Sequence, residues 1–349
     1  MGRSATGYKP GCWSASPRLP RFRPTISARP RPRLAPAPLI RPRPNPPTAS
    51  NAPPSKEIPM KRSRLARVAA AMVAVGGMAM AVAPARADAT LDKIKERGKI
   101  AIGVDEAKPP YGSLDPKTGA IGGFQVALAQ DLANRLGVDL EIVQVIAPTR
   151  VQFLQSGKVD LLIANMQWTQ ERSEALSYAP TPYDKVGGGL LTAKGNGITT
   201  WADLKGKVAC ISQGSNFAKP LAETYGAVVK GLRTVPDSLL ALKGGSCDAS
   251  VHNFPTLYDT VANDPTGEWT AFHLPTQEQL LSAFSVVWTR KGQTDTRAFA
   301  DAAVREWLQS GVLERLAQEA RIPGDYIPSA TRAARAGAFD QAPAEPGAS

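Results

Sequence analysis

Residue types that build metal sites and reactive centres are scarce in this chain of 349 residues, which has three cysteines and two histidines. His252 and His273 are isolated in the sequence and show no metal-ligand spacing. There is no G-x-S-x-G motif and no Cys/His pair, and the glycines at 187–189 lack the G-x-G-x-x-G spacing of a nucleotide-binding loop. We therefore expect no metal and no cofactor, and we interpret 187–189 as a flexible hinge.

Acidic residues are almost missing from the first quarter of the chain. Residues 1–87 hold 16 of the 42 Lys/Arg residues but only Glu57 of the 30 Asp/Glu residues. The rest of the chain therefore has 26 basic and 29 acidic residues, a net charge of −3, although the whole chain has +12. A nucleic-acid-binding protein needs its positive charge on the folded part. The charge distribution disfavours nucleic-acid binding.

Long apolar runs are missing too, with one exception near residue 70. Residues 60–87 combine a basic start, the apolar stretch 68–83 and a small-x-small cleavage motif at Ala85-Arg86-Ala87, which is the pattern of a secretory signal peptide. The stretch is short and rich in Ala and Gly for a membrane span of ~20 residues. We predict cleavage after Ala87, export of the mature chain and no membrane insertion afterwards.

The segment before this signal, residues 1–59, contains 15 of the 31 prolines. Such a composition stays disordered because it cannot form a core. A secretory signal normally begins a chain. We therefore hypothesise that Met60 is the true initiator and that 1–59 is a gene-model artefact.

Alternating strand and helix patterns dominate the remainder. Expected strands at 99–104, 139–146 and 159–164, with helices at 123–136 and 151–155 between them, predict a parallel sheet with right-handed crossovers. The scheme repeats from Lys207, and two extended segments near 186–193 and 283–289 connect the units. We predict an α/β protein of two lobes joined by two hinge strands, and the pattern alone also permits other α/β pairings. The expected ranges are 88–185 and 287–329 for lobe 1, 186–286 for lobe 2, and 330–349 for a loose tail.

The segment 159–172 contains the clearest candidate for a binding site. Its apolar strand ends at Asn165 and Gln167, and open α/β sheets bind ligands at the carboxyl ends of their strands. Arg172 then offers a fork of donors suited to a carboxylate, beside the free N–H groups of a helix start. The alternative interpretation, a core strand followed by a surface arginine without any ligand site, fits the segment equally well. Lys108 could pair with an acidic side chain of a ligand, although exposed lysines are the rule.

Two cysteines, Cys210 and Cys247, remain after the predicted cleavage. A disulfide suits an exported protein, and two free buried thiols are the alternative.

Five stretches in order resemble a known family: IAIGVDEAKPPYG, GGFQVALAQDLANRLG, FLQSGKVDLLIANMQWTQER, DLKGKVACISQGSN and GSCDASVHN. They are similar to the periplasmic amino-acid-type solute-binding proteins of ABC importers (bacterial extracellular family 3), over roughly 91–322. The resemblance implies the type II periplasmic binding protein fold, in which two doubly wound α/β lobes are joined by two hinge strands. It also implies a monomer without enzymatic activity, which captures an amino acid or related small carboxylate and delivers it to a permease.

The resemblance also implies roles for single residues. Arg172 matches the arginine that clamps the ligand's α-carboxylate, and the pair Cys210 and Cys247 matches a family disulfide. The other implied ligand-binding residues are Asp105, Tyr111, Asn165, Gln167, Gly214, Ser215 and Asn216. The implied mechanism is closure of the lobes, driven by a carboxylate that bridges Arg172 and the Ser215-Asn216 turn.

One departure from the family bears on the ligand. Asn253 stands where the family usually has an aspartate that neutralises the ligand's ammonium group. A buried ammonium without a counter-charge is costly. Either Asp105 supplies that charge, or the ligand's amino group is absent or modified.

Two other functions fit the same scaffold. A cyclohexadienyl dehydratase-like enzyme would need a desolvated acid aimed at its substrate, for which Asp105 is the main candidate. A ligand sensor would engage a receptor instead of a permease.

Overall fold

The structure, a computed structural model, describes residues 88–105, 107–115 and 118–344, all within one unit of the chain that begins at Ala79. The predicted signal peptide and the segment 1–59 lie outside the described residues. Within the described part, no helix has the length and apolar character needed to cross a membrane.

The first lobe is built on a five-stranded sheet. Its strand order is β5 (Asp139–Val145), β1 (Lys99–Asp105), β6 (Leu161–Leu162), β14 (Trp288–Thr289) and β7 (Ser177–Tyr178). Strands β5 and β6 pair parallel with β1, and β14 pairs antiparallel with β6 and β7. All of β1 after Lys99 is buried, as expected of a strand covered on both faces. The parallel core predicted from the sequence is confirmed.

Seven helices belong to this lobe. They are α1 (Thr90–Arg97), α2 (Phe124–Leu136), α3 (Arg150–Gln155), α4 (Gln170–Ala175), α8 (Thr294–Ser310), α9 (Val312–Glu319) and α10 (Tyr326–Arg335). Leu128 and Leu132 of α2 pack in one core cluster with Ile102 of β1 and Trp307 of α8. Each fully buried Leu or Ile contributes about 1.5–3 kcal/mol. Helix α2 ends at Gly137, whose φ of 66° suits a glycine cap.

The second lobe is built on a six-stranded sheet. Its strands are β10 (Val228–Leu232), β9 (Val208–Ser212), β11 (Ala249–Asn253), β8 (Asp184–Ala193) and β12 (Phe272–His273), with β13 (Leu280–Ser285) also paired to β8. Its helices are η1 (Trp201–Leu204), α5 (Ala218–Glu223), α6 (Val235–Lys243) and α7 (Phe254–Ala262). A disulfide joins Cys210 of β9 to Cys247, two residues before β11, which confirms the predicted pair.

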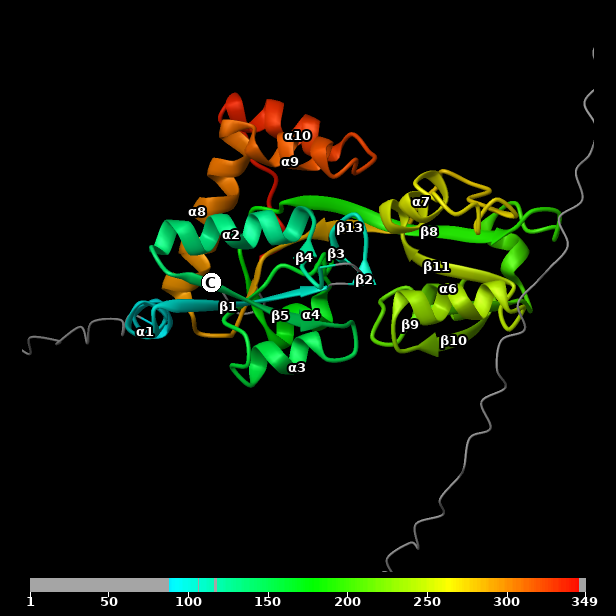
Figure 1. Cartoon of the computed structure of the whole chain (residues 1–349), viewed down its shortest axis with the longest axis horizontal. Coiled ribbons are helices and arrows are strands. Elements are labelled where there is room, and N and C mark those ends of the chain that lie inside the picture. The colour runs from blue at the N-terminus through cyan, green and yellow to red at the C-terminus, as the bar shows by residue number, and fades with distance from the viewer. Residues whose placement is uncertain (1–87, 106, 116–117, 345–349) are drawn as a thin grey trace, which may run out of the picture. The chain divides into compact units, whose positions relative to one another are not determined.

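Strands β8 and β13 connect the lobes. They run antiparallel to each other, and Figure 1 shows them extending between the two sheets. β8 begins at the end of the first lobe, and β13 leads back to β14 of the first sheet. The two crossover segments predicted from the sequence correspond to these strands.

The glycines of β8 are required by close packing, while the flexibility of 187–189 stays a prediction. None of the three has a positive φ. A Cβ atom at Gly187 would lie 2.9 Å from the carbonyl oxygen of Leu280, and one at Gly189 would lie 3.0 Å from Cα of Phe254. Larger residues would push β8 away from β13 and α7.

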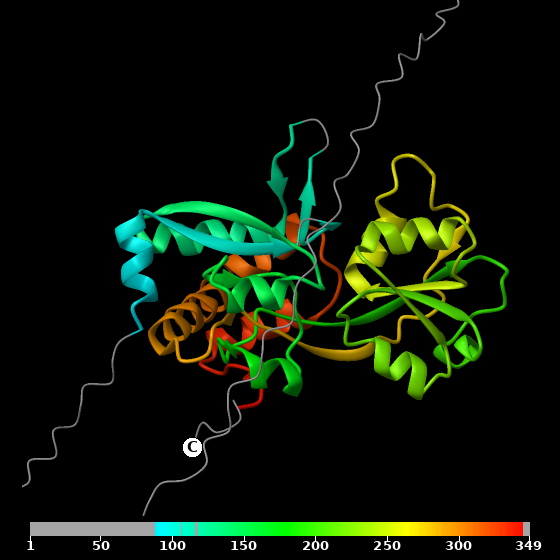
Figure 2. The same cartoon turned by 90° about the horizontal axis from the view of Figure 1, so that it is seen from below.

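A small sheet stands at the edge of the first lobe. It consists of β2 (Ala107–Lys108), β3 (Gly112–Leu114) and β4 (Ile121–Gly122). Figure 2 shows β3 and β4 side by side, projecting away from the main sheet. This small sheet places Lys108 next to the end of β1.

The segment after Ser329 is not a loose tail. Helix α10 continues to Arg335 and packs against α8 and α9 (Figure 1). Ala330, Thr331 and Ala334 are buried along one of its faces. Further on, the backbone N–H of Ala342 donates to the carbonyl oxygen of Pro180 at 2.8 Å. Small residues at helical spacing allow close packing here. The Ala-rich composition therefore wrongly indicated an unpacked tail.

Candidate functional site

Polar side chains from both lobes surround one pocket, called here the interlobe pocket. It lies at the carboxyl ends of strands β6, β9 and β11, the place where open α/β sheets bind ligands. Its lining residues are Lys108, Ala147, Arg150, Asn165 and Gln167 from the first lobe, and Ser212, Ser215, Asn216, Phe217, His252 and Asn253 from the second.

Five of the nine ligand-binding residues predicted from the sequence line this pocket: Asn165, Gln167, Ser215, Asn216 and Asn253. Two more, Arg172 and Gly214, are hydrogen-bonded to each other at its edge. Asp105 contacts the lining residue Lys108. Tyr111 lies elsewhere.

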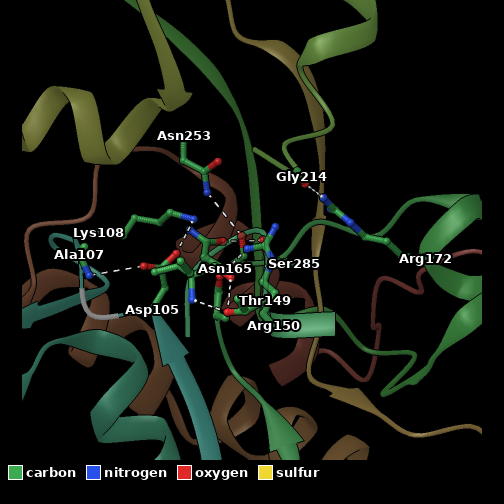
Figure 3. A network of polar contacts seen from close by, with 12 residues as sticks. Asp105, Ala107, Lys108, Thr149, Arg150, Asn165, Arg172, Gly214, Asn253 and Ser285 are labelled. Atoms are coloured by element: carbon green, nitrogen blue, oxygen red, sulfur yellow. Dashed lines mark hydrogen bonds and ion pairs between the residues drawn. The ribbon is translucent and has the colours of Figure 1, made fainter. Parts of the chain in front are cut away.

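Arg172 connects the lobes. Its helix α4 begins after Thr169, whose Oγ1 accepts from the Arg172 backbone N–H at 3.2 Å. Nη1 donates to the carbonyl oxygen of Gln167 at 2.8 Å, and Nη2 donates to that of Gly214 in the second lobe at 3.2 Å (Figure 3). Burial lowers the pKa of Arg172 to about 9, with a contribution from the nearby Arg150 cation. The guanidinium therefore stays charged at neutral pH.

Two further cations line the pocket. Of these, the sequence raised Lys108 as a possible partner of an acidic ligand and did not single out Arg150. Arg150, the first residue of α3, is 5% exposed and donates from Nη1 to the carbonyl oxygen of Ala164 at 3.3 Å. Lys108 is 7% exposed, in contrast to the expected exposed lysine. Burial lowers the pKa of both side chains, and repulsion from Arg150 and Arg172 lowers that of Lys108 further.

Asp105, the last residue of β1, forms an ion pair with Lys108. Its carboxylate lies 3.2 Å from the Lys108 ammonium, and both side chains are buried (Figure 3). It also accepts from the backbone N–H of Ala107 at 3.4 Å. Attraction to Asp105 opposes the effect of burial on the pKa of Lys108.

Asn165 is held rigidly at the centre of the pocket. It adopts a φ of 43°, which Asn tolerates better than most residues. Its Oδ1 accepts from the Ser285 hydroxyl at 2.6 Å, and its carbonyl oxygen accepts from Asn253 Nδ2 at 3.5 Å (Figure 3). Its Nδ2 is buried without a hydrogen-bond partner among the described residues. This donor is available to a ligand.

Gln167 contacts both connecting strands. Its Nε2 donates to the carbonyl oxygens of Val186 in β8 and Leu281 in β13. An isolated bridge also pairs Gln167 with Ser285. The amide nitrogen of Gln167 is thus engaged by the hinge strands, so movement of those strands is coupled to the pocket.

In the turn after β9, part of the predicted donor set is already used. The N–H of Ser215 donates to the carbonyl oxygen of Ser212 at 3.1 Å, and Ser215 Oγ accepts from the N–H of Phe217. The Ser215 N–H is therefore not a free donor for a carboxylate.

Tyr111 does not line the pocket, contrary to the prediction. Its ring is completely buried and packs edge-on against Phe124. Its hydroxyl donates to Oδ2 of Asp184, the first residue of β8, at 2.9 Å. The ring belongs to the apolar core of the first lobe, and its one polar atom is satisfied there.

His252 presents a neutral ring to the pocket. It is 4% exposed, and its Nε2 has no hydrogen-bond partner among the described residues. Burial and the nearby Lys108 cation lower its pKa to about 3. Among the described residues there is also no cluster of His, Cys, Asp or Glu that could hold a metal ion.

Comparisons with known proteins agree with this geometry. The model of the family "Bacterial extracellular solute-binding proteins, family 3" matches residues 100–320. The L-cystine-binding protein TcyJ of Escherichia coli is 30% identical over 66% of this chain and 85% of its own length. The glutamine-binding protein of Geobacillus stearothermophilus is 31% identical over 50% of this chain and 69% of its own length.

A solved structure matches as well. The crystal structure of the cysteine-binding protein from Campylobacter jejuni aligns with a TM-score of 0.61 and 29% identity, covering 66% of this chain and 92% of that one.

Proposed function

The chain belongs to the bacterial extracellular solute-binding proteins of family 3, and from this premise we propose that it is the periplasmic substrate-binding component of an ABC importer. It captures an amino acid or related small carboxylate between its lobes, as a monomer, and delivers it to a permease. The relatives named above, binding proteins for cystine, glutamine and cysteine, support an amino-acid-type ligand.

The observation that carries the proposal is the position of Arg172 between the lobes. Its guanidinium already contacts carbonyl oxygens of both lobes, at Gln167 and Gly214. A ligand carboxylate placed there would replace neutral acceptors with a charged one, which gives roughly twice the hydrogen-bond strength. Contacts to both lobes at once favour the closed form, so the ligand drives closure by differential affinity.

Replacement of Arg172 by Ala tests the proposal. Removing a charged partner of a desolvated carboxylate costs about 2–5 kcal/mol, so we expect at least a ~30-fold loss of affinity in calorimetric titration with the preferred ligand. Arg332→Ala is the matched control, because Arg332 is exposed on α10. Unchanged affinity in Arg172→Ala would refute the assignment.

The dehydratase-like alternative is not favoured by the geometry. Its candidate acid, Asp105, is paired with Lys108 at 3.2 Å. Its carboxylate is engaged by the Lys108 ammonium and the Ala107 backbone N–H, so it is not aimed at a substrate.

A further inference from the structure

Three basic side chains and one acidic side chain gather at the interlobe pocket. Lys108 and Arg150 line it and are at most 7% exposed, and Arg172 lies at its edge. Asp105 is the one carboxylate paired with any of them among the described residues. In Figure 3, Lys108 and Arg150 lie around Asn165, whereas Arg172 reaches toward Gly214. The basic groups therefore form two separate positions.

The net charge of this group is +2. Buried cations without counter-ions are costly, and their mutual repulsion adds to that cost. A carboxylate on Arg172 would neutralise one charge and leave the second position unsatisfied. The guanidinium of Arg150 has five N–H donors, and its recorded bond within the described chain goes to one carbonyl oxygen at 3.3 Å.

The same pocket is poor in groups that could neutralise a ligand's ammonium. Position 253 is an asparagine, and Asp105 is already paired with Lys108. His252 faces the pocket as a neutral ring. Ligands with net positive charge are therefore repelled, and neutral amino acids leave a cation unpaired.

We propose that the interlobe pocket binds a short dicarboxylate, with one carboxylate on Arg172 and the second at Lys108 and Arg150. This inference rests on the proposed function. The required chemistry is two carboxylates, which acidic amino acids and their deaminated analogues share. The unpartnered Nδ2 of Asn165 donates to the ligand between the two basic positions.

Calorimetric titration of the full chain, freed of carried-over ligand by unfolding and refolding, tests the proposal. The probes are L-glutamate, L-aspartate, 2-oxoglutarate and succinate, with L-glutamine, L-cystine and L-arginine as comparisons. We expect at least one dicarboxylate to bind 100-fold or more tightly than every comparison compound. The difference in affinity between L-glutamate and 2-oxoglutarate shows whether the amino group is recognised.

Variants locate the second carboxylate. Arg150→Gln and Lys108→Gln should each weaken the preferred dicarboxylate at least 30-fold and lower its preference over L-glutamine by at least the same factor. Arg150→Lys, which keeps the charge, should retain the preference for dicarboxylates and provides a second test if Arg150→Gln folds poorly. Arg332→Gln, at an exposed site, should behave as wild type.

Three results would count against the inference. Tight binding of a neutral or basic amino acid with no binding of dicarboxylates would refute it and leave the proposed function intact. An equal loss for glutamate and glutamine in Arg150→Gln would show that Arg150 does not contact the second carboxylate. Failure of every compound to bind would count against both the inference and the proposed function.

Discussion

We expect Asn253 to determine how strongly the pocket binds a ligand's ammonium group. Its Nδ2 donates to the carbonyl oxygen of Asn165, and its side chain lines the pocket. Asn253→Asp adds a negative charge near the cations. We expect free amino acids to bind about tenfold more tightly and deaminated acids to bind more weakly, because an ion pair replaces a neutral contact for the first group and repulsion acts on the second. Titration of both classes on both proteins measures the change. Identical affinities would place the ammonium elsewhere.

Asp184 makes the stability of the fold depend on pH. Burial raises the pKa of its carboxyl from 3.8 to about 6, although hydrogen bonds from Tyr111 and the Lys185 N–H oppose this. Its protonated form favours folding fully below pH 3.8, and this contribution is lost as the pH rises through 6. Asp184→Asn stays neutral. We therefore expect the variant to gain about 3 kcal/mol relative to wild type between pH 3.8 and 7.

Urea unfolding of both proteins at pH 4 and pH 7.5 measures this change. Asp139→Asn, at an exposed site, serves as the control substitution. A stability difference for Asp184→Asn that is the same at both pH values would contradict the expected role of burial.

Single residues also show what a sequence can and cannot predict. Asn165 and Gln167 could be proposed as lining residues because they follow a buried strand, and such strands end at ligand sites. Arg150 could not, because arginine is exposed in most proteins and nothing local reports burial by a second lobe. The same rule favoured an exposed Lys108 over one that contacts a ligand. The prediction that Tyr111 lines the pocket was wrong because an aromatic residue in a loop can pack in a core equally well.

Among the elements, β8 depends on its glycines. We expect Gly187→Ala to destabilise the fold by about 1–3 kcal/mol, because the new Cβ would lie 2.6 Å from the Gln279 Cβ and 2.9 Å from the Leu280 oxygen. Chemical denaturation measures the loss. Gly122→Ala is the matched control, because its Cβ would meet no atom within 4 Å and its φ is not positive. Equal stability of both variants would mean that β8 moves away from β13 at little cost.

Element prediction succeeded where periodicity was strong and failed where composition alone was used. The βαβαβ pattern of the first lobe and the parallel pairing of β1 with β5 and β6 followed from apolar runs and helical spacing. Helix α10 was missed because alanine-rich polar segments resemble solvated tails. Its buried face at 327, 330, 331 and 334 has helical spacing, but mostly through small residues that carry a weak apolar signal.

For the whole molecule, the arrangement of hydrogen bonds couples the pocket to the strands that join the lobes. Asn165 bonds to Ser285 of β13, and Gln167 bonds to the carbonyl oxygens of both Val186 and Leu281. The backbone N–H of Trp168 donates to the Phe284 oxygen at 2.6 Å. A two-lobed α/β fold was predictable from the repeated pattern, but these contacts were not, because all but the one between Gln167 and Val186 join residues more than 100 positions apart.

This coupling predicts that ligand binding changes the shape and the stability of the whole chain together. At a free ligand concentration of 1,000 times Kd, mass action stabilises the folded state by about 4 kcal/mol. We expect a smaller radius of gyration in X-ray scattering at the same ligand concentration, because a ligand held by Arg172 and the second lobe favours the closed form. Arg172→Ala, whose affinity is at least ~30-fold lower, should gain at most about 2 kcal/mol at that concentration and should compact less, because its ligand lacks the contact that favours the closed form. Stabilisation of the wild type without compaction would mean that the ligand binds to lobes that are already closed, and that closure precedes capture.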